Sequence, residues 1–252
     1  MALPPPNPSG LPFDDIRDLI SRMPGPDAAA AAQVRAREAE LTKPAGSLGR
    51  LEDIVEWVAA WSANGKPRVD RPLVAIFATS HGVTAQGVSA FPDAVNRQML
   101  ENFAAGGAAI NQICVANDIG LKVFDLAIDV PTADITVADA MDEPGCAATI
   151  AFGMEAIVGA DLLCLGEMGI GNTTVAAAVH HGLYGGEAAD WVGPGSGVDA
   201  EGLERKADAV ARAVARAGGP GLDPLELLRR VGGREIAAIA GAILAARLQR
   251  IP

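Results

Sequence analysis

The sequence has few aromatic residues, few cysteines and no long uninterrupted apolar run. Aromatic residues make up 4% of the chain, and the three cysteines, Cys114, Cys146 and Cys164, are widely spaced among apolar neighbours. An odd number of scattered cysteines does not form a disulfide framework, so we predict buried free thiols. The apolar runs at residues 158–165 and 236–246 are too short to cross a bilayer. We therefore expect no membrane partner.

Positive charge is also scarce. Lysine and arginine number 20 against 31 aspartates and glutamates, which gives a net charge of -11 and an isoelectric point near 4.7. No block of basic residues stands out, so the phosphate backbone of a nucleic acid would be repelled, and we predict no nucleic-acid partner. The first residues, MALPPPNPSGLPFDD, lack the basic start and apolar stretch of a signal peptide. The expected location is the cytoplasm.

Metal ligands are not arranged for chelation. His180 and His181 are adjacent, so on a helix their side chains diverge and do not bind one ion together. No third ligand is evident. We predict no metal site and no cofactor.

The length and composition of the chain are those of a globular α/β protein. With 252 residues and 50% hydrophobic content, it can bury the core of one large domain with a smaller appendage. We divide it into a mobile proline-rich segment (1–13), a helical small subdomain (14–70) and an α/β nucleotide-binding domain (71–252). In the small subdomain, helices are expected at 14–23 and 28–41, and a third follows the loop LTKPAGSLGR.

Strand and helix patterns alternate after residue 72. Apolar runs at 73–79, 121–129 and 160–166 have the length of buried parallel strands, with helices expected at 92–105, at 108–116 and around 150–158. This alternation predicts a parallel sheet with right-handed crossovers. The last third is expected to be helical, with Asp199 and Asp223 capping two helices and a nearly all-apolar helix at 234–248.

The stretch DLLCLGEMGIGNTTVAAAV is the strongest candidate site. It predicts a strand, a glycine-rich turn and a helix start, where backbone N–H groups and the hydroxyls of Thr173 and Thr174 can hold an anion. The spacing from Gly166 to Gly171 fits a triphosphate loop, but Asn172 stands where that loop has its lysine and Glu167 adds a negative charge. A monophosphate therefore fits better than a triphosphate. The alternative is a plain strand-to-helix turn.

Two other loops are candidates for the same site. In WVGPGSGVDAEGLERK, Lys206 could supply the missing positive charge, or it could be an ordinary solvated lysine. In SHGVTAQGVSAFP, His81 could be a ligand or acid/base group, or a structural hydrogen-bonding residue. Because open α/β sheets bind ligands beyond the carboxyl ends of their strands, the loops after Thr79, Ile128 and Leu165 should converge.

Five motifs in order carry a family resemblance. They are LTKPAGSLGRLEDI, HGVTAQGVSAFP, NFAAGGAAINQI, GEMGIGNTT and LDPLELLRRVGGREIAAIAGAILAA. Together they resemble the nicotinate-nucleotide:dimethylbenzimidazole phosphoribosyltransferase family of cobalamin biosynthesis. The resemblance implies a Rossmann-like parallel sheet flanked by helices, a smaller N-terminal helical subdomain and a homodimer. The implied partners are nicotinate mononucleotide and 5,6-dimethylbenzimidazole or a related base, which react to give α-ribazole 5'-phosphate and nicotinate.

The resemblance also implies roles for single residues. Glu167 matches a carboxylate at the reacting centre. The implied phosphate and ribose seat consists of Gly169, Gly171, Asn172, Thr173, Thr174, Gly193, Gly195, Ser196 and Lys206. The implied base-binding residues are Phe91, Met99, Met168 and His81. One departure is Ser80, which stands where the family commonly has an acidic or amide residue before the histidine.

A second departure concerns the C-terminal part. The family's principal general base is a glutamate in an RLGEG-like motif that follows a VLLDG-like strand, and residues up to Pro252 contain neither. We therefore expect the C-terminal strands and that catalytic segment to be absent from the fold. Two hypotheses follow: a phosphoribosyltransferase whose remainder lies outside this sequence, or a truncated, non-catalytic phosphate-binding or dimerising remnant.

Overall fold

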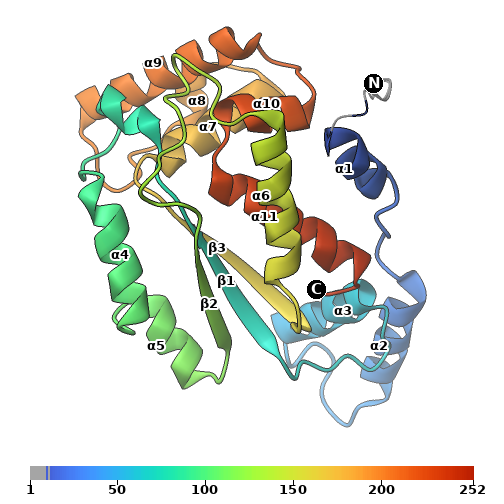
Figure 1. The fold of residues 1–252 in the computed structure, drawn as a ribbon. Helices are drawn as coiled ribbons and strands as arrows, with labels where there is room; N and C mark the ends of the chain where they lie inside the picture. The colour runs from blue at the N-terminus through green and yellow to red at the C-terminus, as the bar shows by residue number, and fades with distance from the viewer. Residues whose placement is uncertain (1–9, 11) are drawn as a thin grey trace.

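The computed structural model describes residue 10 and residues 12–252. The mobile segment predicted at 1–13 therefore lies mostly outside the described residues. Its last two residues, Pro12 and Phe13, begin the first helix, α1 (Pro12–Ser21). Phe13 and Ile16 are buried in the main hydrophobic core, and the Phe13 N–H donates to the Glu143 carboxylate at 3.0 Å. These contacts join α1 to the α/β part of the chain (Figure 1).

A three-stranded parallel sheet forms the centre of the fold, as the sequence predicts. The strands are β1 (Pro72–Ala78), β2 (Gly120–Asp125) and β3 (Leu162–Met168), in the order β2-β1-β3. Phe77 of β1 lies opposite Phe124 of β2 and Glu167 of β3. The central strand is buried along nearly its whole length because helices cover both of its faces, which explains its continuous apolar sequence.

Helices lie on both faces of this sheet (Figure 1). On one face are α4 (Ala94–Ala104) and α5 (Ala109–Ala116), whose apolar side chains pack with Val74 and Ile76. On the other are α6 (Glu143–Ala156) and α11 (Arg234–Leu248), which pack with Phe77. The predicted α/β architecture with flanking helices is confirmed.

Two glycines let α6 and α11 approach closely. A methyl group at Gly153 would lie 1.9 Å from the Ala238 carbonyl oxygen, and one at Gly241 would lie 1.8 Å from the Ile150 carbonyl oxygen. Both distances are too short for any side chain at these two positions. The pair of glycines therefore sets the spacing of the two helices that carry this face of the core.

A second group of helices surrounds the glycine-rich loops. It consists of the short 3-10 helix η1 (Gly82–Gln86), α7 (Asn172–Tyr184), α8 (Ala188–Trp191), α9 (Ala200–Ala217) and α10 (Pro224–Val231). Asp199 accepts from the Gly202 N–H at 2.8 Å and Asp223 accepts from the Leu225 and Glu226 N–H groups at 3.1 Å. Both predicted helix starts are therefore confirmed.

The helices α2 (Ala28–Glu40) and α3 (Arg50–Ser62) pack on each other. Between them, the Lys43 ammonium lies 2.6 Å from carboxylates of both Glu38 and Glu52. The LTKPAGSLGR loop is thus tied to the helix before it and the helix after it. In the described part of the chain no helix is long and apolar enough to cross a membrane.

Three predicted boundaries were wrong. The strand predicted to end at Asp129 ends at Asp125, because the Asp125 carboxylate accepts from the Ile128 N–H at 2.8 Å and turns the chain. The strand predicted to end at Gly166 continues to Met168, paired with Ala78. The helix expected around 150–158 begins at Glu143, capped by Asp142.

The prediction for the cysteines was partly wrong. All three are free, and Cys114 and Cys146 are buried, but Cys164 is exposed. It lies on β3, at the edge of the sheet, on the face where α5 covers β2 and β1. An apolar neighbourhood in sequence does not tell an edge strand from a central one.

Candidate active site

The glycine-rich turn joins β3 to α7 and has little freedom. Gly171, with a φ of 90°, precedes the first residue of α7. The Ile170 N–H donates to the Asn96 side-chain oxygen at 2.8 Å, which fixes the turn against α4. Asn96 is buried, and sequence reasoning missed it because a single polar residue in an amphipathic helix gives no signal of its distant partner.

The backbone donors at the start of α7 are already occupied. The Asn172 N–H donates to Gly169, the Thr174 N–H to Gly171 and the Thr173 N–H to the Asn172 side chain, at 2.8 to 3.0 Å. An anion at this turn therefore depends on side chains and on the dipole of α7 more than on free N–H groups. The hydroxyl of Thr174 is buried and has no hydrogen-bond partner among the described residues.

Lys206 of α9 supplies the positive charge. Its ammonium donates to the Thr173 hydroxyl at 2.8 Å and to the Gly193 carbonyl at 2.7 Å. The side chain is 1% exposed, and no carboxylate of the described residues lies within ion-pair distance of it. Burial lowers the pKa of Lys206. A buried ammonium without a counter-ion is stabilised by a bound anion.

The second glycine loop closes around the same ammonium. A methyl group at Gly195 would lie 3.1 Å from the Lys206 nitrogen and 3.0 Å from the Thr173 hydroxyl oxygen. The structure therefore brings together Thr173, Gly193, Gly195 and Lys206, from loops and helices that are separate in the chain. Ser196 lies next in this loop and is exposed. The alternative of a solvated surface lysine is wrong.

Glu167 lies near the end of the strand that leads to this seat. Side chains alternate along β3, so Glu167 shares the face of Leu163 and Leu165, toward α11. Its carboxylate accepts a hydrogen bond from the Asn172 amide. The side chain keeps contact with solvent, yet desolvation by the surrounding protein raises the pKa of Glu167; the Asn172 hydrogen bond lowers it and the Glu235 charge raises it further.

His81 is buried beneath the turn. Its side chain has no exposed surface, and its Nε2 atom lies 3.3 Å from the Glu235 carboxylate. Sequence reasoning missed Glu235, although it is the only acidic residue of the mainly apolar α11. That was the available signal, because a carboxylate within a buried helix needs a partner.

The predicted base-binding residues lie in different environments. Phe91 is 49% exposed in the loop before α4, and Met99 is half-buried within α4. Met168 lies on the sheet face opposite Glu167, where it packs against the hydrophobic cluster that contains Ile76. None of these side chains, nor His81, lines either cavity described below, so their role stays a prediction.

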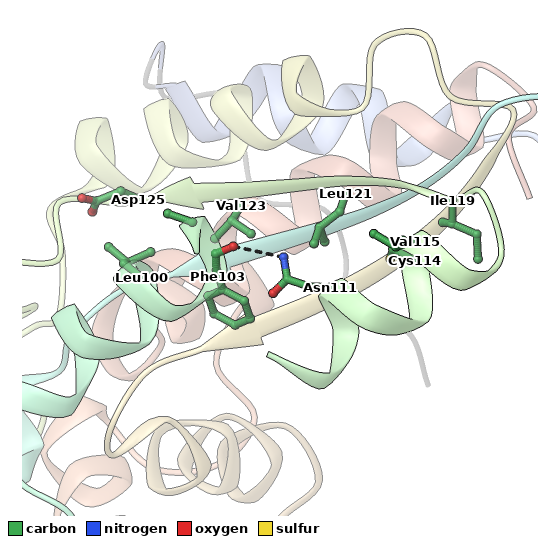
Figure 2. Close-up of a pocket in the computed structure, with 10 residues that line it drawn as sticks. Leu100, Phe103, Asn111, Cys114, Val115, Ile119, Leu121, Val123 and Asp125 are labelled. Atoms are coloured by element: carbon green, nitrogen blue, oxygen red, sulfur yellow. Dashed lines mark hydrogen bonds between the residues drawn. The ribbon is translucent and has the colours of Figure 1, made fainter. Parts of the chain in front are cut away.

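Two cavities flank α4. Figure 2 shows the larger, about 600 Å³, between α4–α5 and strand β2, where Asn111 donates to the Phe103 carbonyl at 3.0 Å. It is lined mainly by apolar side chains and lies on the sheet face away from Glu167. The smaller, about 500 Å³, lies beyond the carboxyl ends of β1 and β2 and includes Ser80, Asn96 and Ile128. The loops after β1 and β2 meet at this second cavity, whereas the β3–α7 loop contributes no lining residue and is linked to it through the bond from Ile170 to Asn96.

No cluster of three or more histidine, cysteine, aspartate or glutamate side chains in residue 10 or residues 12–252 is arranged to hold a metal ion. The turn itself presents one carboxylate, one ammonium and hydroxyl groups. These groups can anchor an anion at Lys206 and accept a proton at Glu167.

Comparison with known proteins shows the family of the chain. The sequence model of a phosphoribosyltransferase family matches residues 23–252. The nicotinate-nucleotide–dimethylbenzimidazole phosphoribosyltransferases of Brucella anthropi and Sinorhizobium fredii are each 66% identical over 245 residues, covering 97% of this chain and 72% of theirs.

Solved structures give the same result. The crystal structure of CobT from Thermus thermophilus superposes with a TM-score of 0.82 at 42% identity, covering 89% of this chain and 73% of that one. A second, of the nicotinate-nucleotide–dimethylbenzimidazole phosphoribosyltransferase of the same organism, has a TM-score of 0.78 at 40% identity, covering 90% and 73%. The chain therefore belongs to the nicotinate-nucleotide–dimethylbenzimidazole phosphoribosyltransferase family.

Proposed function

We propose that this protein transfers the phosphoribosyl group of nicotinate mononucleotide to 5,6-dimethylbenzimidazole, giving α-ribazole 5'-phosphate and nicotinate in cobalamin biosynthesis. Family membership supports the reaction class. The observation that carries the proposal is the buried Lys206 ammonium, which has no carboxylate partner among residue 10 and residues 12–252 and lies at the start of α7, one short turn from Glu167. The remnant hypothesis is not favoured, because both the anion seat and a carboxylate with a raised pKa are retained.

The reaction needs an anchor and a proton acceptor. One azole nitrogen of the base forms a bond to C1 of the ribose, while the bond from C1 to the pyridinium nitrogen breaks and its electron pair stays on nicotinate. The configuration at C1 inverts, so the β-nucleotide gives an α-product. The other azole nitrogen loses its proton, which the carboxylate accepts.

The residues of the turn fit these two tasks. Lys206 and the Thr173 hydroxyl hold the phosphate, helped by the positive end of the α7 dipole. Glu167, on β3 before the turn, accepts the azole proton, and its raised pKa brings it closer to neutral pH, where proton transfer is efficient. Anchoring the phosphate apart from the reacting carbon positions C1 without blocking it.

We place the base near Phe91, whose exposed ring is available for stacking on an aromatic ligand. Met99, Met168 and His81 complete the proposed slot on the strength of the family resemblance. Because Met168 and His81 are packed in other contacts, the slot requires these side chains to rearrange or to act from behind the ligand. Substitution of Phe91 by alanine should weaken binding of the base and leave binding of the nucleotide intact.

We also propose that the protein is a homodimer in the cytoplasm. Helix α3 exposes an apolar strip of Leu51, Ile54, Val55 and Trp57, each between 43% and 59% accessible. A second copy of the chain would cover such a strip and remove it from water. Sedimentation velocity tests this, since replacing Ile54 by glutamate should yield a monomer, whereas glutamate at the exposed Val137 should leave a dimer.

The reaction itself is tested by mass spectrometry of the products from the two pure substrates. Wild-type protein should form α-ribazole phosphate, and Glu167→Gln should reduce the rate by about 10²- to 10⁴-fold while keeping the affinity for nicotinate mononucleotide. If the wild-type chain binds the nucleotide but forms no product, the remnant hypothesis replaces this proposal.

A further inference from the structure

A buried histidine and glutamate meet beneath the glycine turn. The side chains of His81 and Glu235 are 0% and 1% exposed, and the His81 Nε2 atom lies 3.3 Å from the nearer Glu235 oxygen. Neither oxygen of Glu235 has a hydrogen-bond partner in the part of the chain that the structure describes, and the contact with Nε2 is at ion-pair distance without hydrogen-bond geometry. Glu235 therefore has no polar neighbour closer than His81 among the described ion pairs and hydrogen bonds.

A buried carboxylate in this state is costly unless a partner satisfies it. Removing one member of such a pair is strongly destabilising, because the other charge is left uncompensated. The position of Glu235 in the first turn of α11, where the helix dipole favours negative charge, offsets part of that cost. Its neighbour Arg234 donates to the Val130 carbonyl instead of to Glu235.

The pair touches the turn that carries the site. A methyl group at Gly169 would lie 3.0 Å from His81 Nε2, and one at Gly233 would lie 2.6 Å from His81 Cε1 and 2.2 Å from the Glu235 carboxylate. The imidazole is thus held between the β3–α7 turn and the start of α11. On its other side, His81 Nδ1 lies 3.5 Å from the Thr132 hydroxyl.

Charges on His81 and on Glu235 both act on Glu167. It lies on the α11 face of the sheet, and the titratable groups of the elements that meet there are His81 after β1, Arg234 and Glu235 on α11, and Glu167 itself on β3. The Glu235 carboxylate disfavours the ionised form of Glu167, whereas a charge on His81 favours it. The charges of the buried pair therefore influence the ionisation of Glu167, the proton acceptor of the proposed reaction.

We propose that Glu235 is a positioning residue that acts through His81: the pair holds the Gly169 turn against α11 and keeps a negative charge behind Glu167. The role in catalysis rests on the proposed transfer reaction. Both side chains are buried, and neither belongs to the anion seat of Thr173 and Lys206. The carboxylate of Glu235 orients the ring, and the ring supports the turn.

The test is a titration of Glu167, followed by carbon-13 NMR of its carboxyl group, in wild type and in Glu235→Gln. The glutamine keeps the shape and removes the charge, so Glu167 should titrate at lower pH. A purely structural Glu235 would leave that titration unchanged, and this result would overturn the proposal. Glu155→Gln removes an exposed carboxylate of α6, the helix packed on α11, and should not move the titration.

A second measurement needs no variant, in case Glu235→Gln does not fold. Nitrogen-15 NMR of the wild-type protein should show a proton on the Nε2 atom of His81, facing Glu235. A bare Nε2 atom would contradict the proposal. Both readouts are independent of turnover, so a chain that passes them but forms no α-ribazole phosphate refutes the proposed reaction alone, while a chain that forms product but fails them refutes the role of Glu235 alone.

Discussion

A single hydrogen bond of 2.8 Å, from the Lys206 ammonium to the Thr173 hydroxyl, joins α9 to the first turn of α7. The two residues are 33 positions apart in the chain, and the bond places an ammonium at a glycine-rich turn without its own lysine, where we propose that an anion binds. The same ammonium holds the Gly193 carbonyl at 2.7 Å, so both glycine loops depend on one side chain.

Substituting Lys206 should separate phosphate binding from base binding. Lys206→Met removes the charge that we propose faces the phosphate, and a charge-assisted hydrogen bond of about 1.5–3 kcal/mol corresponds to a loss of about 10- to 100-fold in affinity. Calorimetry should show this loss for nicotinate mononucleotide and almost none for nicotinate. Lys122→Met on β2, far from the turn, serves as the control.

The affinity should also depend on pH. Because burial lowers the pKa of Lys206, the ammonium loses its proton at a lower pH than an exposed lysine does. Affinity for nicotinate mononucleotide should therefore fall as the pH rises through that lowered pKa, and Lys206→Met should abolish this fall. Equal losses for the nucleotide and for nicotinate would contradict the role given to Lys206.

The pH dependence of the rate should be set by Glu167. The proton acceptor must be ionised, and desolvation raises the pKa of Glu167, so kcat/KM should decline on the acid side at a higher pH than for an ordinary glutamate. The Asn172 hydrogen bond opposes that shift. Asn172→Ala should therefore move the acid limb to still higher pH.

The control for this shift is Asn117→Ala. Asn117 donates to the Ile113 carbonyl at 2.9 Å at the end of α5 and has no contact with the turn. Its removal should leave the acid limb in place. An acid limb that stays fixed in Asn172→Ala would show that another group accepts the proton.

The sequence predicts those parts of the site whose interacting residues lie close together in the chain. The turn, the caps at Asp199 and Asp223, and the identity of Lys206 follow from short patterns and motif order. Asn96, Glu235 and the exposure of Cys164 do not, because each depends on a contact, or its absence, between elements far apart in the chain. Strand ends were missed for a related reason, since pairing with β1 extends β3 beyond the predicted end at Gly166 to Met168.

Asp139 should stabilise the contact of α9 with α10. Its carboxylate lies 2.8 Å from Arg216 and 2.7 Å from Arg229. Burial disfavours the charge, but the hydrogen bonds from the two guanidinium groups outweigh it and hold the pKa of Asp139 below its usual value. Asp139→Ala should lower the free energy of unfolding by about 1–2 kcal/mol, measured in urea near neutral pH.

The sign of the pH effect follows from the lowered pKa of Asp139. A depressed pKa contributes stability that is present above the pKa of the unfolded state and lost as the pH falls through the folded one. The difference between wild type and Asp139→Ala should therefore shrink in acid. Asp208→Ala breaks an exposed pair with Arg212 and should cost about 0.5 kcal/mol or less. Equal effects of the two substitutions would contradict the prediction.

The close contact of α6 with α11 should not tolerate a methyl group. An alanine at Gly241 gains about 0.5–1 kcal/mol in helix propensity. Its methyl group, however, would lie 1.8 Å from the backbone oxygen of Ile150, so the helices must separate, at a typical cost of about 1–3 kcal/mol or more. Gly241→Ala should thus lower the thermal midpoint, whereas Gly25→Ala, with no atom within 4 Å of the added carbon, should not. Because α11 also carries Glu235, the loss of packing should also disturb the Gly169 turn. A Gly241→Ala protein with an unchanged thermal midpoint would show that the two helices are not fixed by this spacing.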